Sequence, residues 1–120
     1  MRRSQSQRSK RIADLILREI GTILTEEVQD PRLDLVSISG VRMNKDLSIA
    51  EVLYTHSGDE AKREQVQKAL DAARGYIRTL LGKRLNMRRT PELRFVWDEF
   101  LEVMVYDRSQ GSGRPDDQGE

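Results

Sequence analysis

The sequence predicts one α+β domain, in which helices cover one face of a three-stranded sheet, with the element order α-β-β-α-α-β. Two observations lead to this class. Apolar residues recur at three- and four-residue spacing in three segments and alternate in three others. Each such helix has a single apolar stripe, which one face of a sheet can cover. The 120 residues are enough for one core and too few for two.

The first element is expected to be a helix. Apolar residues at helical spacing run from Ile12 to Val28, and Ser9 just before them is a suitable N-cap. Pro31 disfavours helical geometry in the residue before it, so the helix should end near Gln29. Residues 30–33 then form a turn.

A β-hairpin is expected next. Two strands, at 35–43 and 48–55, flank the polar turn 44–46. In the first strand the apolar residues change parity at Gly40, which predicts a β-bulge there.

The second half is expected to contain two helices and a third strand. Apolar spacing predicts helices at 59–73 and 75–85, which meet at Gly75. Pro91 follows the second helix, and residues 93–97 alternate as a strand. Residues 98–107 fit either a fourth strand or a short helix.

The domain boundaries follow from composition. Residues 1–7 are expected to be a flexible basic N-terminus, 8–107 the folded domain, and 108–120 a disordered acidic tail that has almost no apolar side chains to bury. The N-terminus lacks the apolar stretch of a signal peptide, and no segment is apolar enough to span a bilayer. We therefore expect a cytoplasmic protein without membrane contact.

Formal charge is sorted along the chain. The net charge of +1 combines +5 over residues 1–11, −5 over 12–73, +6 over 74–94 and −5 over 95–120. Separated blocks of one sign give a directed electrostatic surface that suits an anionic partner such as nucleic acid. For any single block, a solvated helix face is the ordinary alternative.

An enzyme active site is not expected. With no cysteine and one histidine, a zinc site would depend on His56 and the carboxylates of residues 59–60, which fit an acidic helix start better. Ser57 cannot pair with His56 as nucleophile and base, because neighbours in a strand point to opposite faces. No phosphate-binding loop ending in Lys-Ser or Lys-Thr occurs. We expect no catalytic residue, metal, cofactor or small-molecule substrate.

A series of short motifs runs through residues 8–97. In chain order they are Asp30-Pro31-Arg32-Leu33, Ser39-Gly40-Val41, Asp46-Leu47, Ala73-Arg74-Gly75, Tyr76-Ile77-Arg78, Leu81-Gly82-Lys83 and Thr90-Pro91-Glu92-Leu93. Each motif is weak alone, but the set is specific and resembles the bacterial ribosome-binding factor A family, whose fold is of the type II KH kind. The resemblance implies that residues 8–107 form a KH-like RNA-binding domain.

The motif between the two expected helices departs from ordinary KH domains. Those domains clamp RNA with a Gly-x-x-Gly loop, which this sequence lacks. Ala73 and Gly75 instead match the Ala-x-Gly kink that the resembled family has at this place. Gly75 lacks a Cβ, which permits a change of helix direction. By spacing alone, an ordinary helix C-cap glycine is the alternative.

The resemblance implies a non-catalytic factor of bacterial ribosome biogenesis. Such a factor binds the immature small (30S) ribosomal subunit and its 16S rRNA during late maturation and rRNA processing, and is associated with cold adaptation. Contacts to ribosomal proteins are left open. We expect the chain to act as a monomer.

Basic side chains are expected to make most of the RNA contacts. Arginine forks suit phosphate oxygens, and such contacts fix position on RNA without reading bases. Tyr76 and Trp97 could stack on bases, but aromatics at such positions are more often in the core. The expected RNA-binding residues are Arg8, Lys10, Arg11, Arg74, Arg78, Lys83, Arg84, Arg88 and Arg89.

Two binding alternatives stay open. The expected helices at 59–73 and 75–85 also fit a helix-turn-helix that reads DNA, although apolar residues occupy much of the second helix. A protein-interaction module would instead use Ile49 and Leu53 on the open sheet face. RNA affinity that collapses with salt would separate the ribosomal interpretation from such a module.

Overall fold

The structure, a computed structural model, describes residues 6–99 and confirms the α+β class. Expectations for residues 1–5 and 100–120, including the acidic tail and most of segment 98–107, lie outside the described residues. The element order is α-β-β-α-β. The elements are α1 (Gln7–Glu26), the 3-10 helix η1 (Pro31–Leu33), β1 (Val36–Met43), β2 (Ile49–His56), α2 (Glu60–Arg84) and β3 (Glu92–Trp97).

Helix α1 begins earlier than expected. Ser6 is its N-cap in place of Ser9, and the Ser6 hydroxyl oxygen accepts a hydrogen bond from the Ser9 backbone N–H at 3.0 Å. Both serines can cap a helix, and the apolar pattern starting at Ile12 does not choose between them. The basic residues between positions 8 and 11 therefore lie in the first turns of a helix.

The turn after α1 is built on Asp30, as expected. The Asp30 carboxylate accepts hydrogen bonds from the Arg32 backbone N–H at 3.0 Å and from Arg32 Nη2 at 2.7 Å. Hydrogen bonding to Arg32 lowers the pKa of Asp30. Asp30 in this way caps η1 and leads the chain toward β1.

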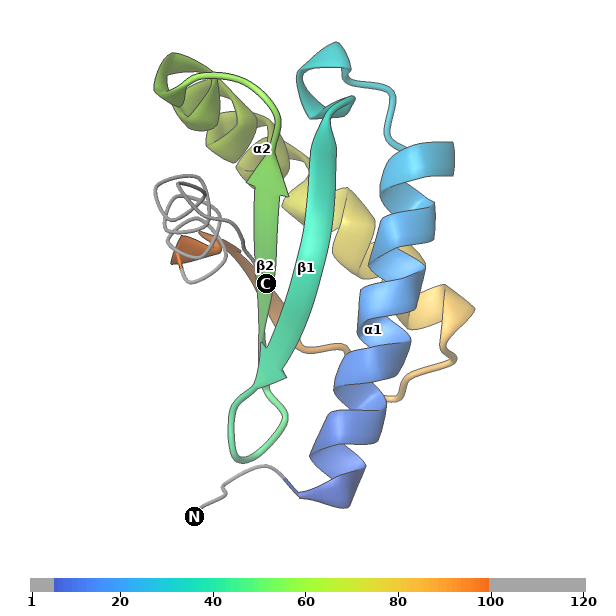
Figure 1. Ribbon diagram of the computed structural model, residues 1–120. Helices are drawn as coiled ribbons and strands as arrows, with labels where there is room; N and C mark the ends of the chain where they lie inside the picture. The colour runs from blue at the N-terminus through green and yellow to red at the C-terminus, as the bar shows by residue number, and fades with distance from the viewer. Residues whose placement is uncertain (1–5, 100–120) are drawn as a thin grey trace, which may run out of the picture.

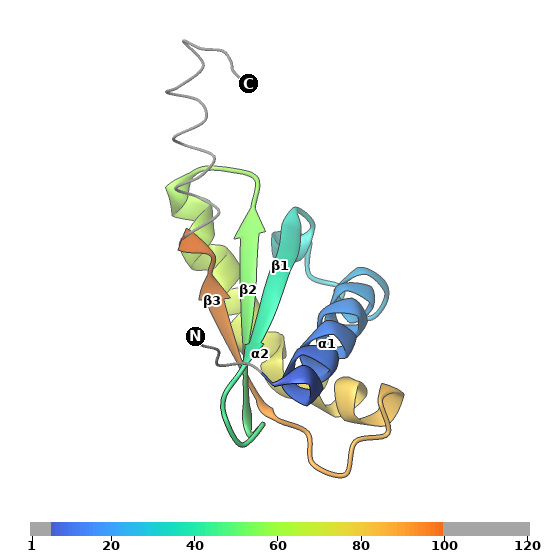
Figure 2. The ribbon, with the colours of Figure 1, turned by 60° about the horizontal axis from the view of Figure 1, so that its bottom comes forward.

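The three strands form one mixed sheet in the order β1-β2-β3 (Figure 2). β1 and β2 pair antiparallel, and their register shifts between Ile38 and Gly40, which confirms the predicted bulge. β2 and β3 are parallel. A parallel pair needs a long crossover, which α2 provides. Figure 1 shows α2 passing behind the strands and α1 lying beside β1.

Helix α2 is a single helix of 25 residues, in place of the two helices that the sequence predicts. The predicted break is wrong: Ala73 and Gly75 lie inside α2, and Gly75 does not have a positive φ angle. One glycine costs a helix only about 1 kcal/mol. Burial of Leu70 and Ile77 on either side offsets that cost. A kink role for Ala73 and Gly75 within the helix stays a prediction.

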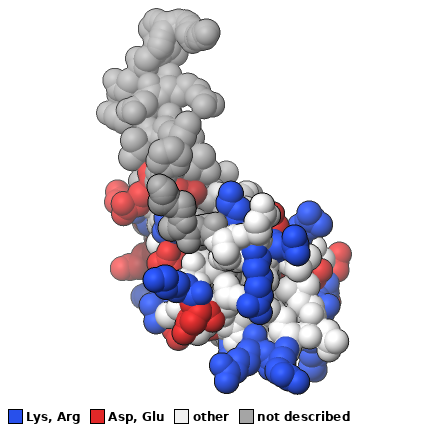
Figure 3. Space-filling view, turned by 90° about the horizontal axis from the view of Figure 1, so that it is seen from below, with Lys and Arg blue, Asp and Glu red and all other residues white. Residues whose placement is uncertain are grey.

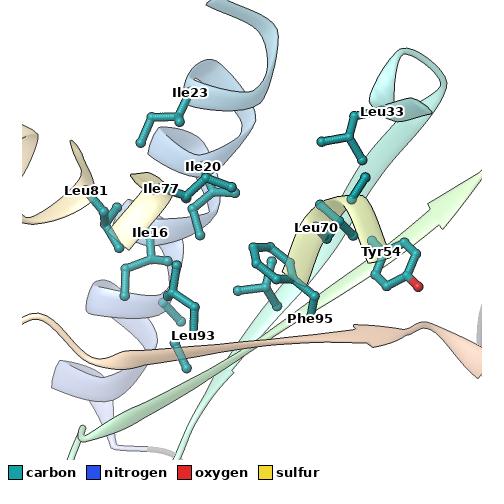
Figure 4. Packing of buried hydrophobic residues seen from close by; sticks show 14 of the residues in the cluster. Ile16, Ile20, Ile23, Leu33, Tyr54, Leu70, Ile77, Leu81, Leu93 and Phe95 are labelled. Atoms are coloured by element: carbon teal, nitrogen blue, oxygen red, sulfur yellow. The ribbon is translucent and has the colours of Figure 1, made fainter. Parts of the chain in front are cut away.

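One core joins both helices to the inner face of the sheet (Figure 4). Burying a large apolar side chain stabilises the fold by about 1.5–3 kcal/mol. Because one cluster contains side chains from α1, α2 and all three strands, the helices cover the same face, as predicted. Its largest fully buried side chains are Ile16, Ile20, Ile23, Val52, Tyr54, Leu70, Ile77, Leu81 and Leu93.

Candidate nucleic-acid interface

A groove lies at the end of the molecule where α1 begins, and we call it the basic groove. Its walls are the first turns of α1, the β1–β2 turn and the loop between α2 and β3, and its volume is about 950 Å³. Figure 3 views this end of the molecule and shows Lys and Arg side chains spread over it. The groove brings together four predicted RNA-binding residues: Arg8, Arg78, Arg88 and Arg89.

The β1–β2 turn forms one wall and is held by its own side chains. Asn44 Oδ1 accepts from the Ile49 N–H at 2.9 Å, and Asp46 Oδ1 accepts from the Ser48 hydroxyl at 2.6 Å. Hydrogen bonds from Ser48 lower the pKa of Asp46. The network holds Leu47 in the left-handed region, at a φ of 63°. These hydrogen bonds therefore fix the conformation of this wall without any contact from a ligand.

The opposite wall starts at the C-terminal end of α2. Asn86 adopts a φ of 51°, and the Met87 N–H donates to the Gly82 carbonyl at 3.0 Å, which closes the helix with a Schellman motif. Asparagine tolerates this left-handed conformation better than most residues. The chain then leaves the helix and places Met87, Arg88 and Arg89 along the groove.

Arg78 lines the groove and also holds its wall. Its Nε donates to the Pro91 carbonyl at 3.0 Å, and its Nη2 donates to the Thr90 carbonyl at 2.7 Å. Hydrogen bonds from a charged donor are stronger than neutral ones. Arg78 therefore anchors the α2–β3 loop to α2, while its charge still contributes to the potential of the groove.

Gly82 lets the same loop lie close to α2, and a substitution can test this. A Cβ at Gly82 would lie 2.5 Å from Thr90 Oγ1, so we expect Gly82→Ala to destabilise the fold by about 1 kcal/mol. With Thr90→Ala also present, that clash disappears, and alanine should add up to about 1 kcal/mol of stability through helix propensity. A double-mutant cycle in urea measures the change of sign. Stabilisation by Gly82→Ala alone would show that Thr90 moves aside at no cost.

Three arginines of the basic groove are available to a partner. The side chains of Arg8, Arg88 and Arg89 are exposed, and within residues 6–99 none of them forms an ion pair or a side-chain hydrogen bond. The two acids of the groove have other contacts. Asp46 bonds to Ser48, and Glu92 Oε2 lies 3.0 Å from Arg94 Nε. An incoming phosphate would therefore find arginine donors that are not engaged.

Arg84 does not belong to this set. Its Nη1 lies 3.4 Å from Glu19 Oε1, and its Nη2 lies 3.0 Å from Glu27 Oε2 and 3.9 Å from Glu26 Oε1. The charge of +6 over segment 74–94 therefore does not describe the surroundings of Arg84, because the acids that pair with it come from α1 and its C-cap, Glu27. We infer that Arg84 ties α2 to α1, and we leave it out of the proposed RNA surface.

The other predicted RNA-binding residues lie outside the groove lining. Arg74 is exposed, and its Nη1 lies 3.7 Å from Asp71 Oδ1. Lys10 and Arg11 are exposed on α1, and Lys83 is exposed in the last turn of α2. RNA contact by these four residues stays a prediction.

The two aromatic candidates for base stacking have different environments. Trp97 packs against the core, as expected, with its ring centroid 5.6 Å from that of Tyr54 and the Arg63 guanidinium 4.2 Å above it. Tyr76 is 51% exposed, so the expected core position is wrong for it. The neighbouring Ile77 occupies the buried face of α2 in its place.

The structure bears on both binding alternatives, the DNA-reading helix-turn-helix and the protein-interaction module. A helix-turn-helix needs two helices joined by a turn, which the continuous α2 contradicts. Ile49 and Leu53, which the protein-interaction alternative would use, are half-buried.

Among residues 6–99, no three His, Asp or Glu side chains are grouped so that they could hold a metal ion. No helix in that range is long and apolar enough to cross a membrane.

Sequence patterns do not predict the remaining lining of the basic groove. The polar turn at 44–46 signals one wall, but no local pattern places it beside the chain that follows α2. The remaining lining is apolar or acidic for the most part: Ile12, Leu47, Met87, Pro91, Asp46 and Glu92.

Known proteins share this architecture. The family model for ribosome-binding factor A matches residues 8–107. The chain belongs to the ribosome-binding factor A family. A ribosome-binding factor A from Halothermothrix orenii is 40% identical over 96 residues, which are 80% of this chain and 79% of that relative.

Solved structures of ribosome-binding factor A have the same fold. The crystal structure from Thermus thermophilus is similar at a TM-score of 0.66 and 28% identity, and the match covers 73% of this chain and 93% of that one. A homology model of the T. thermophilus factor, fitted into the cryo-electron microscopy map of a 30S–RbfA complex, is similar at a TM-score of 0.62 and 29% identity. That match covers 72% of this chain and 91% of the other. The predicted fold class is confirmed, with one α2 in place of two helices.

Proposed function

We propose that this chain binds the immature 30S subunit through its 16S rRNA during late maturation and rRNA processing. Membership of the ribosome-binding factor A family supports a ribosome-binding role. The structural similarity to a factor fitted into a 30S map supports the small subunit as the partner. The proposed factor works in the cytoplasm as a binder without a catalytic step, and it supports subunit assembly in the cold.

The observation that carries this proposal is the cluster of unengaged arginines at the basic groove. Arg8, Arg88 and Arg89 come from two distant segments and line one groove, although the whole chain is nearly neutral. Guanidinium forks match phosphate oxygens, and a charged end orients the protein as it approaches RNA. Contacts of this kind fix the protein on rRNA without requiring a base sequence.

Sedimentation of a cell extract through a sucrose gradient tests the proposed function. We expect the protein to comigrate with small-subunit particles that contain unprocessed 16S rRNA, and to be depleted from 70S ribosomes. The purified protein should leave these particles as salt rises, because phosphate contacts compete with counterions. Recovery only as free protein or with 70S ribosomes would contradict the proposal. Association that does not weaken as the salt concentration rises would favour docking on a ribosomal protein.

A further inference from the structure

The basic groove combines half-buried apolar side chains with the three exposed arginines Arg8, Arg88 and Arg89, which we call the arginine rim. Ile12, Leu47 and Met87 line it and are half-buried, and Pro91 beside them is buried. A surface that binds only phosphates has no need for apolar side chains between its cations. A nucleotide has both properties, since a flat base with apolar faces is joined to charged phosphates.

We propose that the basic groove holds an unpaired nucleotide of single-stranded RNA, with the base against Leu47 and Met87 and the flanking phosphates on the rim arginines. This assignment deepens the proposed function and rests on it. Charge complementarity favours this occupant, because Arg8, Arg88 and Arg89 lack partners within residues 6–99. The groove, at about 950 Å³, is large enough for one nucleotide and its neighbouring phosphates.

The two carboxylates of the groove fit a base better than a phosphate. When they are ionised, Asp46 and Glu92 accept hydrogen bonds and cannot donate them. Exocyclic amino groups of adenine, cytosine and guanine are donors that would match them. Hydrogen bonds that Ser48 donates lower the pKa of Asp46 and so favour its charged form. A phosphate placed beside these acids would be repelled, so we assign the phosphates to the arginine rim.

A base-paired RNA helix does not suit this site. Its bases are stacked on each other, and their faces are not available to side chains. An unpaired nucleotide exposes those faces and can stack or pack on an apolar wall. The walls are also preformed, because hydrogen bonds fix the turn at Leu47 and the Schellman motif fixes the chain at Asn86. A preformed site loses less entropy on binding than a flexible one.

Fluorescence anisotropy with a labelled single-stranded RNA, free or annealed to its complement, tests the assignment. The parent protein should prefer the single strand. Met87→Gln removes the apolar contact without changing charge and should weaken single-strand binding about tenfold. Duplex binding and the salt dependence should not change, because the arginines remain. Leu35→Gln is the matched control: Leu35 is 58% exposed and precedes β1, away from the groove, so this variant should bind like the parent.

A second measurement keeps the test independent of the variant. In the unmodified protein, the Met87 methyl resonance should shift on addition of the single strand, since a base ring close to it changes its magnetic environment. No shift, equal affinity for single strand and duplex, or equal behaviour of Met87→Gln and Leu35→Gln would overturn the assignment. The sedimentation experiment tests the proposed function separately. If the parent protein prefers single strands but never comigrates with small-subunit particles, the proposed function is refuted and the groove assignment stands.

Discussion

Reversing the charge of Arg88 and Arg89 together should weaken binding to 16S rRNA fragments and leave the fold intact. Both side chains are exposed and line the basic groove, and neither has a partner within residues 6–99. If each holds one phosphate, the slope of log affinity against log salt should become shallower by about 1.4, at roughly 0.7 per single-strand phosphate. Anisotropy titrations over a range of salt concentrations measure this slope, and thermal unfolding checks the fold.

A matched control for this variant is Lys62→Glu combined with Lys68→Glu. It makes the same change in net charge on exposed residues of the N-terminal half of α2, and neither lysine lines the basic groove. Screening limits the reach of surface charges to about 10 Å at ordinary salt, so the control should lose much less affinity. Equal losses in both variants would contradict the assignment of phosphates to the groove. Cells that carry only the groove variant should also accumulate immature small subunits at low temperature.

Local sequence pattern was enough to predict most elements of the fold. The bulge at Gly40 follows from a change of parity within eight strand residues, and the turn at Asp30 follows from the proline after it. Each signal involves neighbours in the chain, whose geometry backbone sterics decide. The α+β class then follows because each amphipathic element has only one face to bury.

The continuity of α2 could not be predicted in the same way. A glycine within an apolar helical pattern fits both a helix end and an exposed position inside a longer helix. The apolar residues on both sides of Gly75 keep one register, and burial of Ile77 and Leu81 continues the stripe of Leu70. Tertiary packing favours the continuous helix over a helix end at Gly75. The helix propensity of one residue is too small to decide between the two.

The proposed functional surface depends most on contacts between distant segments. The basic groove joins positions near residues 8, 46 and 88, and no spacing rule links them. Arg84 shows the same limit from the opposite side. Its acidic partners Glu19 and Glu27 precede it by 65 and 57 residues, so a charge sum over segment 74–94 could not include them. Summed charge located the two basic segments, 1–11 and 74–94, but could not separate paired from available cations.

Arg84 is expected to contribute to stability by linking α2 to the acids at the C-terminal part of α1. Its two terminal nitrogens contact the carboxylates of Glu19 on α1 and of Glu27, the C-cap of α1. The Arg84 side chain is 29% exposed, so solvent screens these contacts only in part. Arg84→Glu would bring a fourth carboxylate to a place where Glu19, Glu26 and Glu27 already meet. We expect it to destabilise the fold by about 2 kcal/mol, from lost charged hydrogen bonds and new repulsion. In a domain of this size the melting temperature should fall by about 10 °C.

Two further variants separate an interhelical role of Arg84 from RNA binding. Arg84→Lys keeps the charge but loses the guanidinium fork that reaches two carboxylates. It should therefore lower the free energy of unfolding measurably, but by less than Arg84→Glu does. Combining Arg84→Glu with Glu27→Lys should recover part of the lost stability, because opposite charges again face each other across α1 and α2. At a temperature where Arg84→Glu is still folded, its RNA affinity should stay within about twofold of the parent, because only charges outside the groove have changed. Unchanged stability together with a large loss of RNA affinity would return Arg84 to the RNA surface.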